Sequence, residues 1–184
     1  MGIPEIVAAQ REYFCSGATR PYESRRDALL ALQRAVRENE GRIADAMRKD
    51  LNKSPFESYL CETGLVLDEV RFHLKHLKRW MQPTRVHTPL AQFPSRSFVS
   101  PEPYGVALIM SPWNYPVQLC LEPLIGAISA GNCAVVKPSA YAPATSRVLA
   151  ELLGGIFPPE YVAVVEGGRA ENSALLEQRF DYIF

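Results

Sequence analysis

The chain has 184 residues, 47% of them hydrophobic and 22% charged, which suits one globular domain with a helical appendage. Twenty basic side chains balance twenty acidic ones, so the charge favours neither nucleic acid nor an anionic membrane as a partner. No apolar run reaches the roughly 18 residues of a membrane-spanning helix, so we expect no membrane anchor. The first residues lack the apolar core of a signal peptide, and the four scattered cysteines favour a reduced, cytoplasmic protein.

Residues 1–81 are predicted to be helical. Gly41 is expected to separate two helices, each with an apolar stripe at helical spacing. A strong start signal for a long helix follows at Ser54–Glu57, which has a capping serine, a proline in the first turn and a glutamate three residues after the serine. That helix is expected to run until Pro83. Its predicted buried stripe comprises Leu60, Leu67, Val70, Leu74, Leu77 and Met81.

Residues 82–103 change character, because five prolines punctuate them. Phe93–Val99 alternates between apolar and polar side chains in the manner of a strand. Prolines at both ends favour an edge strand or an extended arm, and an ordinary linker is the alternative.

Residues 104–184 alternate between short apolar runs and helical patterns. The expected strands are Val106–Met110, Ala134–Val136, Val162–Val165 and Tyr182–Phe184. The helices between them are expected to begin at Pro116, at Pro143 and near Ser173. This alternation implies right-handed crossovers and a parallel sheet. The predicted fold is therefore α/β, in which N-terminal helices and an extended arm lead into the first part of a Rossmann-like sheet.

Two polar loops follow the first two predicted strands, and open α/β sheets bind ligands at that edge. Asn114 lies in the first loop, where its amide can donate a hydrogen bond to an oxygen that becomes negative during a reaction. The sequence alone equally allows Asn114 to be a turn residue. Lys137 ends the second strand, and its charge suits ribose hydroxyls or a phosphate. A solvated lysine is the alternative there.

The motifs at these loops are SPWNYP, residues 111–116, and GNCAVVKPS, residues 131–139. They resemble the aldehyde dehydrogenase superfamily, in particular its class 3 and fatty-aldehyde branch. Further segments also resemble that branch and occur in the same order as in its members: RPYESRRDALLAL, KDLNKSPFES, FPSRSFVSPEPYGV, VVEGG and FDYIF. The resemblance covers nearly the whole chain. It implies oxidation of aldehydes to carboxylic acids with NAD or NADP, through a cysteine thiohemiacetal, and a homo-oligomer in which residues 82–103 pair with another subunit.

The resemblance also implies roles for individual residues. Asn114 would hold the oxyanion of the thiohemiacetal, and Lys137 would bind the adenosine ribose. The cofactor-binding residues implied in this way are Ser111, Pro112, Trp113, Asn114, Lys137, Ser139, Ala140, Gly167 and Gly168. Ala140 departs from the branch, which usually has a glutamate directly after KPS. Loss of that carboxylate removes one reason to exclude a 2′-phosphate, so use of both NAD and NADP is predicted.

Neither the nucleophilic cysteine nor the general-base glutamate of the family has a match here, because both would follow Phe184. We therefore expect the chain to be a truncated part of a longer enzyme, inactive by itself and prone to self-association. One alternative is a short non-catalytic protein that binds a nucleotide or pairs with subunits. Another is a reductase of acyl-phosphates or acyl-CoA thioesters on the same scaffold. No metal site is predicted, since His73 and His76 are expected to be solvated.

Overall fold

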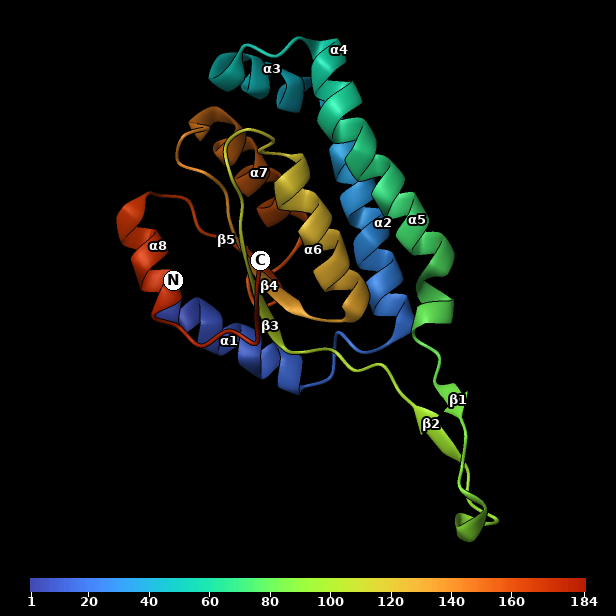
Figure 1. The fold of residues 1–184 in the computed structure, drawn as a ribbon. Coiled ribbons are helices and arrows are strands. Elements are labelled where there is room, and N and C mark those ends of the chain that lie inside the picture. The colour runs from blue at the N-terminus through green and yellow to red at the C-terminus, as the bar shows by residue number, and fades with distance from the viewer.

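The computed structural model describes all 184 residues and has a four-stranded parallel sheet at its centre (Figure 1). The strands are β3 (Val106–Met110), β4 (Cys133–Lys137), β5 (Val162–Val164) and β6 (Tyr182–Ile183), in the spatial order β5-β4-β3-β6. The chain moves outward from β3 to β5 and then returns past β3 to add β6. All four predicted strands are thus present. Short apolar runs form β3, β4 and β5 because both faces of this part of the sheet are covered, whereas both residues of β6 are exposed.

Helices cover the sheet on both faces (Figure 1). Leu108 and Val135 face α1 (Ile3–Cys15) and α8 (Arg169–Leu176), where they pack with one residue from each helix. Ile109 and Val136 belong instead to the larger core beneath α6 (Gln118–Ala130) and α7 (Pro143–Ile156). Neighbouring strand residues therefore alternate between two hydrophobic clusters, as the pleat of a strand requires.

A further helical layer packs outside α6 and α7. It consists of α2 (Tyr22–Glu38), α3 (Glu40–Leu51), α4 (Pro55–Ser58) and α5 (Gly64–Trp80). Helices α2 and α5 pack against α6, and α3 packs against α7. No helix combines the length and the apolar character needed to cross a bilayer.

The start and end of some helices differ from the prediction. Gly41 lies inside α3, so the predicted break at that residue is wrong. The break is at Asn39, whose side-chain amide donates to the carbonyl oxygen of Ala35 and competes with the helical pattern. Helix α6 begins at Gln118, two residues after Pro116, and α8 begins at Arg169, before the predicted start near Ser173.

A π-helical turn, Tyr59–Thr63, joins α4 to α5. The wider turn rotates the buried face, so that Glu62 points inward and Leu60 is 57% exposed. The prediction that Leu60 belongs to the buried stripe is therefore wrong. A methyl group on Gly64 would lie 2.7 Å from the carbonyl oxygen of Tyr59, so only glycine lets the turn close in this way.

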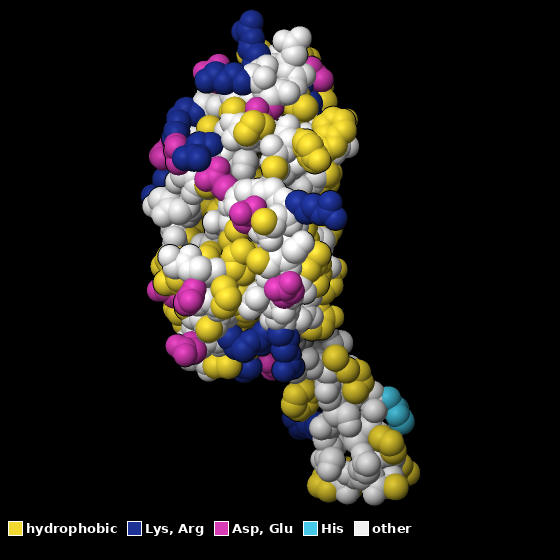
Figure 2. Space-filling view, turned by 90° about the vertical axis from the view of Figure 1, so that its left-hand side faces the viewer, with side chains coloured by type: hydrophobic (Ala, Val, Ile, Leu, Met, Phe, Trp, Pro, Cys, Tyr) yellow, Lys and Arg dark blue, Asp and Glu magenta, His cyan; other side chains and the backbone are white.

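Residues 82–103 form a hairpin that stands off from the body of the molecule (Figures 1 and 2). Its strands β1 (Thr84–Val86) and β2 (Ser97–Val99) pair in antiparallel fashion, and a 3₁₀ turn, Leu90–Gln92, forms part of its tip. Only the last three residues of the predicted strand Phe93–Val99 are a strand. Figure 2 shows hydrophobic side chains along the hairpin, and those that are largely exposed are Val86, Leu90, Phe93, Phe98 and Val99.

Helix α1 ties distant parts of the chain to the sheet. The buried amide of Gln10 donates to the carbonyl oxygens of Ala134, at 2.8 Å, and of Pro159, at 3.0 Å. Arg11 pairs with Asp181 at 3.0 Å, and the Asp181 carboxylate also accepts from the backbone N–H of Val106. The first helix, the first sheet strand and the approach to β6 are thereby held together.

Gly131 is predicted to be essential to the end of α6. It has a φ of +90°, and a methyl group there would lie 2.6 Å from the guanidinium carbon of Arg25. Gly131→Ala should therefore lower the free energy of unfolding by about 2 kcal/mol in urea denaturation followed by circular dichroism. A methyl group on Gly126 of the same helix would meet no atom within 4 Å. Gly126→Ala should therefore leave the free energy of unfolding unchanged or raise it by about 0.5–1 kcal/mol. Equal effects of the two substitutions would contradict this account.

Candidate functional site

A polar hollow of about 310 Å³ lies where β3 and β4 end and α8 begins. It brings together five of the residues that the sequence predicts for cofactor binding: Ser111, Lys137, Ser139, Ala140 and Gly168. Tyr141 and Arg169 also line it. We call it the carboxyl-edge hollow, because it occupies the edge of the parallel sheet at which ligands bind in open α/β folds.

Lys137 is the most deeply placed cation of the carboxyl-edge hollow. Its side chain is buried, so the alternative of a solvated lysine is wrong. The ammonium donates to the carbonyl oxygens of Pro138, at 2.8 Å, and of Gly167, at 2.6 Å. Burial lowers the pKa of Lys137, while Glu171 and Glu166 oppose that shift. An ammonium has three N–H donors, so one is left for a ligand.

Two polar atoms of the hollow have no hydrogen-bond partner in the chain. The Ser111 hydroxyl is buried and unpartnered, and so is the amide oxygen of Asn172. The Ser111 hydroxyl lies near the Cys120 thiol and opposes the rise in the pKa of Cys120, but the two groups do not meet hydrogen-bond geometry. Buried polar groups are normally paired, so these two atoms favour a polar ligand in the hollow. Together with the spare donor of Lys137, they fit a ligand rich in hydroxyl and phosphate oxygens.

The loop between β3 and α6 carries the other predicted residues. Pro112, Trp113 and Asn114 are exposed and do not line the hollow. Lys53 holds this loop, since its ammonium donates to the backbone carbonyl of Asn114 at 3.0 Å and lies 4.3 Å from the centre of the Tyr115 ring. The carboxamide of Asn114 makes no hydrogen bond within the chain. Its backbone is thus fixed while its side-chain donors remain free.

Glu62 contacts both Lys53 and the start of α6, which follows the same loop. Its carboxylate is fully buried and pairs with Lys53 at 2.5 Å. It also accepts from the backbone N–H groups of Val117, at 2.7 Å, and Gln118, at 3.2 Å. A side chain from the outer helical layer therefore caps the N-terminus of α6, a position in which negative charge is favourable.

The role of Glu62 was not predicted from the sequence. Fifty-five positions separate Glu62 from Val117, and the π-helical turn that buries the glutamate has no sequence signature. The available signal was a charged residue beside the predicted apolar stripe, which helical periodicity places on the solvent side.

The cysteines of this chain are poor nucleophiles where they are buried. Burial raises the pKa of Cys120 to about 12 and that of Cys133, to which Cys15 adds a smaller effect, also to about 12. Such thiols remain protonated at neutral pH and are unreactive. Cys61 is half-buried, and Cys15 is exposed.

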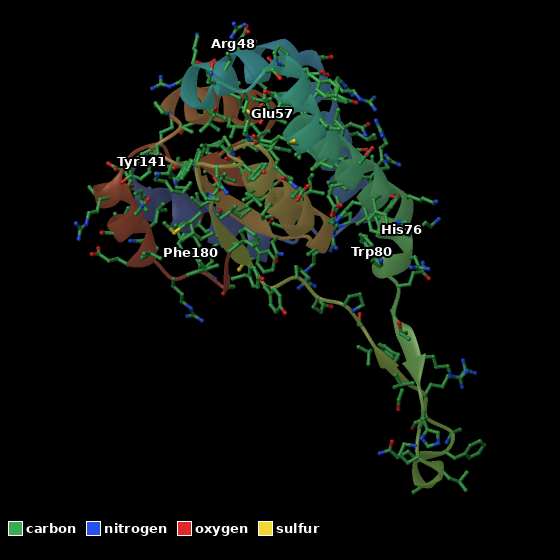
Figure 3. All side chains as sticks on the ribbon, turned by 45° about the horizontal axis from the view of Figure 1, so that its top comes forward. Arg48, Glu57, His76, Trp80, Tyr141 and Phe180 are labelled. Carbon is green, nitrogen blue, oxygen red and sulfur yellow. The ribbon has the colours of Figure 1, made fainter.

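His73 is not solvated, so that prediction is wrong. Its ring nitrogens lie 2.6 Å from the Ser129 hydroxyl and 3.0 Å from the Glu69 carboxylate, and burial lowers the pKa of His73. His76 stacks on Trp80 at the hairpin end of α5 (Figure 3). No three His, Cys, Asp or Glu side chains converge in an arrangement that could hold a metal ion.

A parallel sheet with helices on both faces and a polar hollow at its carboxyl edge defines an open α/β protein of the ligand-binding kind. Residues 2–183 match the profile described as "Aldehyde dehydrogenase family". The chain belongs to that family.

Its relatives are longer proteins. The chain is 45% identical to "Aldehyde dehydrogenase family 3 member B1" of Bos taurus over 95% of its own length and 37% of that protein. It is 44% identical to "Aldehyde dehydrogenase" of Craterostigma plantagineum, over 97% of its own length and 37% of that protein. Identity to "4,4'-diaponeurosporen-aldehyde dehydrogenase" of Staphylococcus aureus is 40%, over 95% of this chain and 38% of that protein. The chain thus spans little more than a third of these relatives.

Solved structures agree with this assignment. The structure described as "Substrate bound state of Staphylococcus Aureus AldH" has a TM-score of 0.97 and 38% identity, and the match covers all of this chain and 40% of that one. A glyceraldehyde-3-phosphate dehydrogenase, GapN, of Methanocaldococcus jannaschii, solved in complex with NADP, has a TM-score of 0.76 at 18% identity, with 92% of this chain and 37% of that one covered. At that identity the likeness shows the shared fold alone.

Glu62→Gln is predicted to destabilise the chain strongly. The substitution removes the charge that pairs with Lys53 and caps α6, so the free energy of unfolding should fall by about 3 kcal/mol. Glu57→Gln is the matched control, because Glu57, labelled in Figure 3, has an exposed carboxylate. It should change the free energy of unfolding by less than about 0.5 kcal/mol. Urea denaturation of both variants measures this, and similar losses in the two would refute the buried role of Glu62.

Proposed function

We propose that this chain forms the first part of the active site of an aldehyde dehydrogenase that oxidises aldehydes to carboxylic acids with NAD or NADP. Family membership supports this reaction class. The observation that carries the proposal is the buried Lys137 ammonium, which lines the carboxyl-edge hollow with one donor to spare. We also propose a division into a helical segment at 1–81, an oligomerisation arm at 82–103 and a partial cofactor-binding domain at 104–184.

The carboxyl-edge hollow is the proposed site for the adenosine ribose of the cofactor. Lys137 donates to the ribose hydroxyls, and the hydroxyl of Ser139 lies in the same hollow to share them. Gly168 also lines the hollow, and the carbonyl of the preceding residue, Gly167, accepts a hydrogen bond from the ammonium of Lys137. When bound, NAD or NADP supplies the hydride acceptor of the reaction.

Asn114 is proposed to stabilise the oxyanion that forms when the aldehyde carbonyl is attacked. Its carboxamide is an unused donor on a loop whose backbone is held by Lys53 and, through α6, by Glu62. A donor carried on a backbone that is already held needs less reorganisation as negative charge develops, which is why such groups accelerate acyl chemistry. Pro112 and Trp113 flank it as walls of the nicotinamide side.

The nucleophile and the general base are proposed to lie outside these residues, in keeping with the family resemblance. The buried thiols of Cys120 and Cys133 do not suit the role. We therefore expect no steady production of NADH from an aldehyde by the 184 residues alone. The hairpin 82–103, with its exposed hydrophobic side chains, is proposed to pair with another subunit of a homo-oligomer.

Lys137→Gln is predicted to weaken binding of NAD⁺ to the purified chain by about tenfold, because a charged hydrogen bond to the ribose is lost. Ligand-observed NMR titration measures the affinity. Lys75→Gln, at an exposed lysine of α5, is the control and should bind as the unaltered chain does.

Ser111→Ala provides a second variant, because Lys137 also donates to two backbone carbonyl groups and its loss could disturb the fold. It removes a hydroxyl without a partner, so stability should not fall while NAD⁺ binding weakens. Unchanged affinity in both variants would refute the site.

Asn114→Ala is predicted to lower kcat about 10²–10³-fold in an active enzyme that contains this chain, with a much smaller change in KM. The physical reason is that the donor acts on charge present only in the transition state. Steady-state assay of aldehyde oxidation measures both constants. An equal loss for Gln118→Ala, which lies on the first turn of α6, would point to a general disturbance of the loop instead.

A further inference from the structure

Arg169 is a cation of the carboxyl-edge hollow that the roles above leave unused. It is the first residue of α8, is exposed and lines the hollow together with Lys137, Ser139 and Ala140. Its guanidinium takes part in none of the salt bridges of the chain. An arginine with no carboxylate partner, at the rim of a hollow that contains a buried unpaired hydroxyl, is available to an anionic ligand.

The two glutamates nearest to this part of the hollow are already engaged. Glu166 accepts from the side chain of Arg147 at 3.2 Å. Glu171 accepts from the backbone N–H of Gly168 at 2.6 Å, and hydrogen bonds from its own N–H and that of Gly168 lower the pKa of Glu171. Position 140, which faces the hollow, is an alanine. The hollow therefore presents two cations and no unengaged carboxylate among the residues that line it.

We propose that Arg169 makes the hollow selective for an adenosine ribose that carries a 2′-phosphate, and hence for NADP over NAD. The inference rests on the proposed cofactor role of the hollow. A guanidinium binds phosphate through two parallel hydrogen bonds. In sites selective for NAD, a carboxylate binds the 2′-hydroxyl instead and would repel a 2′-phosphate. The N-terminus of α8, whose first residue is Arg169, adds partial positive charge on the same side.

The shape of the hollow fits the same ligand. Its volume of about 310 Å³ is at the lower end of the range for small-molecule sites and accommodates part of a dinucleotide. Tyr141 is 83% exposed and lies on the same side of the molecule as α8 in Figure 3, so the mouth of the hollow stays open to solvent. A phosphate at Arg169 keeps part of its hydration there, which lessens the cost of binding a doubly charged group.

The test compares two probes that differ only in the 2′-phosphate, namely 2′,5′-ADP and 5′-AMP. Isothermal titration of the purified chain at low ionic strength should give an affinity for 2′,5′-ADP at least about tenfold higher than that for 5′-AMP. Arg169→Gln should abolish the preference while it lowers the affinity for 5′-AMP much less than that for 2′,5′-ADP. Arg169→Lys should retain part of it, because the charge remains but the two-pronged contact is lost. Arg48→Gln, at an exposed arginine of α3 that does not line the hollow and is labelled in Figure 3, is the control for net charge and should retain the full preference.

Each failure has a distinct meaning. Equal affinities of the unaltered chain for the two probes, or an unchanged preference in Arg169→Gln, would overturn the role of Arg169 and leave the cofactor site standing. If Arg48→Gln loses the preference to the same extent as Arg169→Gln, the preference reflects general charge attraction, which would likewise overturn the proposal. Absence of binding by either probe would overturn the proposed cofactor site and the role of Arg169 together.

Discussion

The buried carboxylate of Glu62 is the interaction on which the arrangement of the proposed active site depends. A charge without access to water costs several kcal/mol unless donors surround it, and here one ammonium and two backbone N–H groups do so. The three donors come from the segment after α3 and from the start of α6. One side chain therefore sets the distance between the outer helical layer and the loop that carries Asn114.

The two proposed functional side chains, Asn114 and Lys137, lie at the carboxyl ends of neighbouring strands. The loop after β3 offers an uncharged donor, Asn114, whereas the last residue of β4 is a buried cation, Lys137. Met110 and Lys137 are paired in the register of the two strands, so both loops leave the sheet at the same level. A parallel sheet is what makes this possible, because it brings successive carboxyl ends to one edge.

Much of the sheet could be predicted from sequence, because β3, β4 and β5 are short apolar runs ended by proline, glycine or charged residues. The hollow was predictable for the same reason, since Ser111 and Lys137 directly follow or end those runs. The inward turn of Glu62 was not, because it depends on a π-helical turn that shifts helical periodicity by part of a turn. The break at Asn39 was missed as well, since a glycine two residues later offered the more familiar signal.

The attachment of α1 has a consequence for the order in which the chain acquires its structure. Arg11 and Asp181 are 170 positions apart, and Gln10 reaches the carbonyl of Pro159 across 149 positions. During synthesis the first helix leaves the ribosome long before these partners exist, so it cannot complete these contacts until the segment before β6 emerges. Contacts between such remote positions slow folding, because the intervening chain must lose its freedom before they form. Helix α1 is accordingly seated later than most of the helices and strands that follow it within these 184 residues.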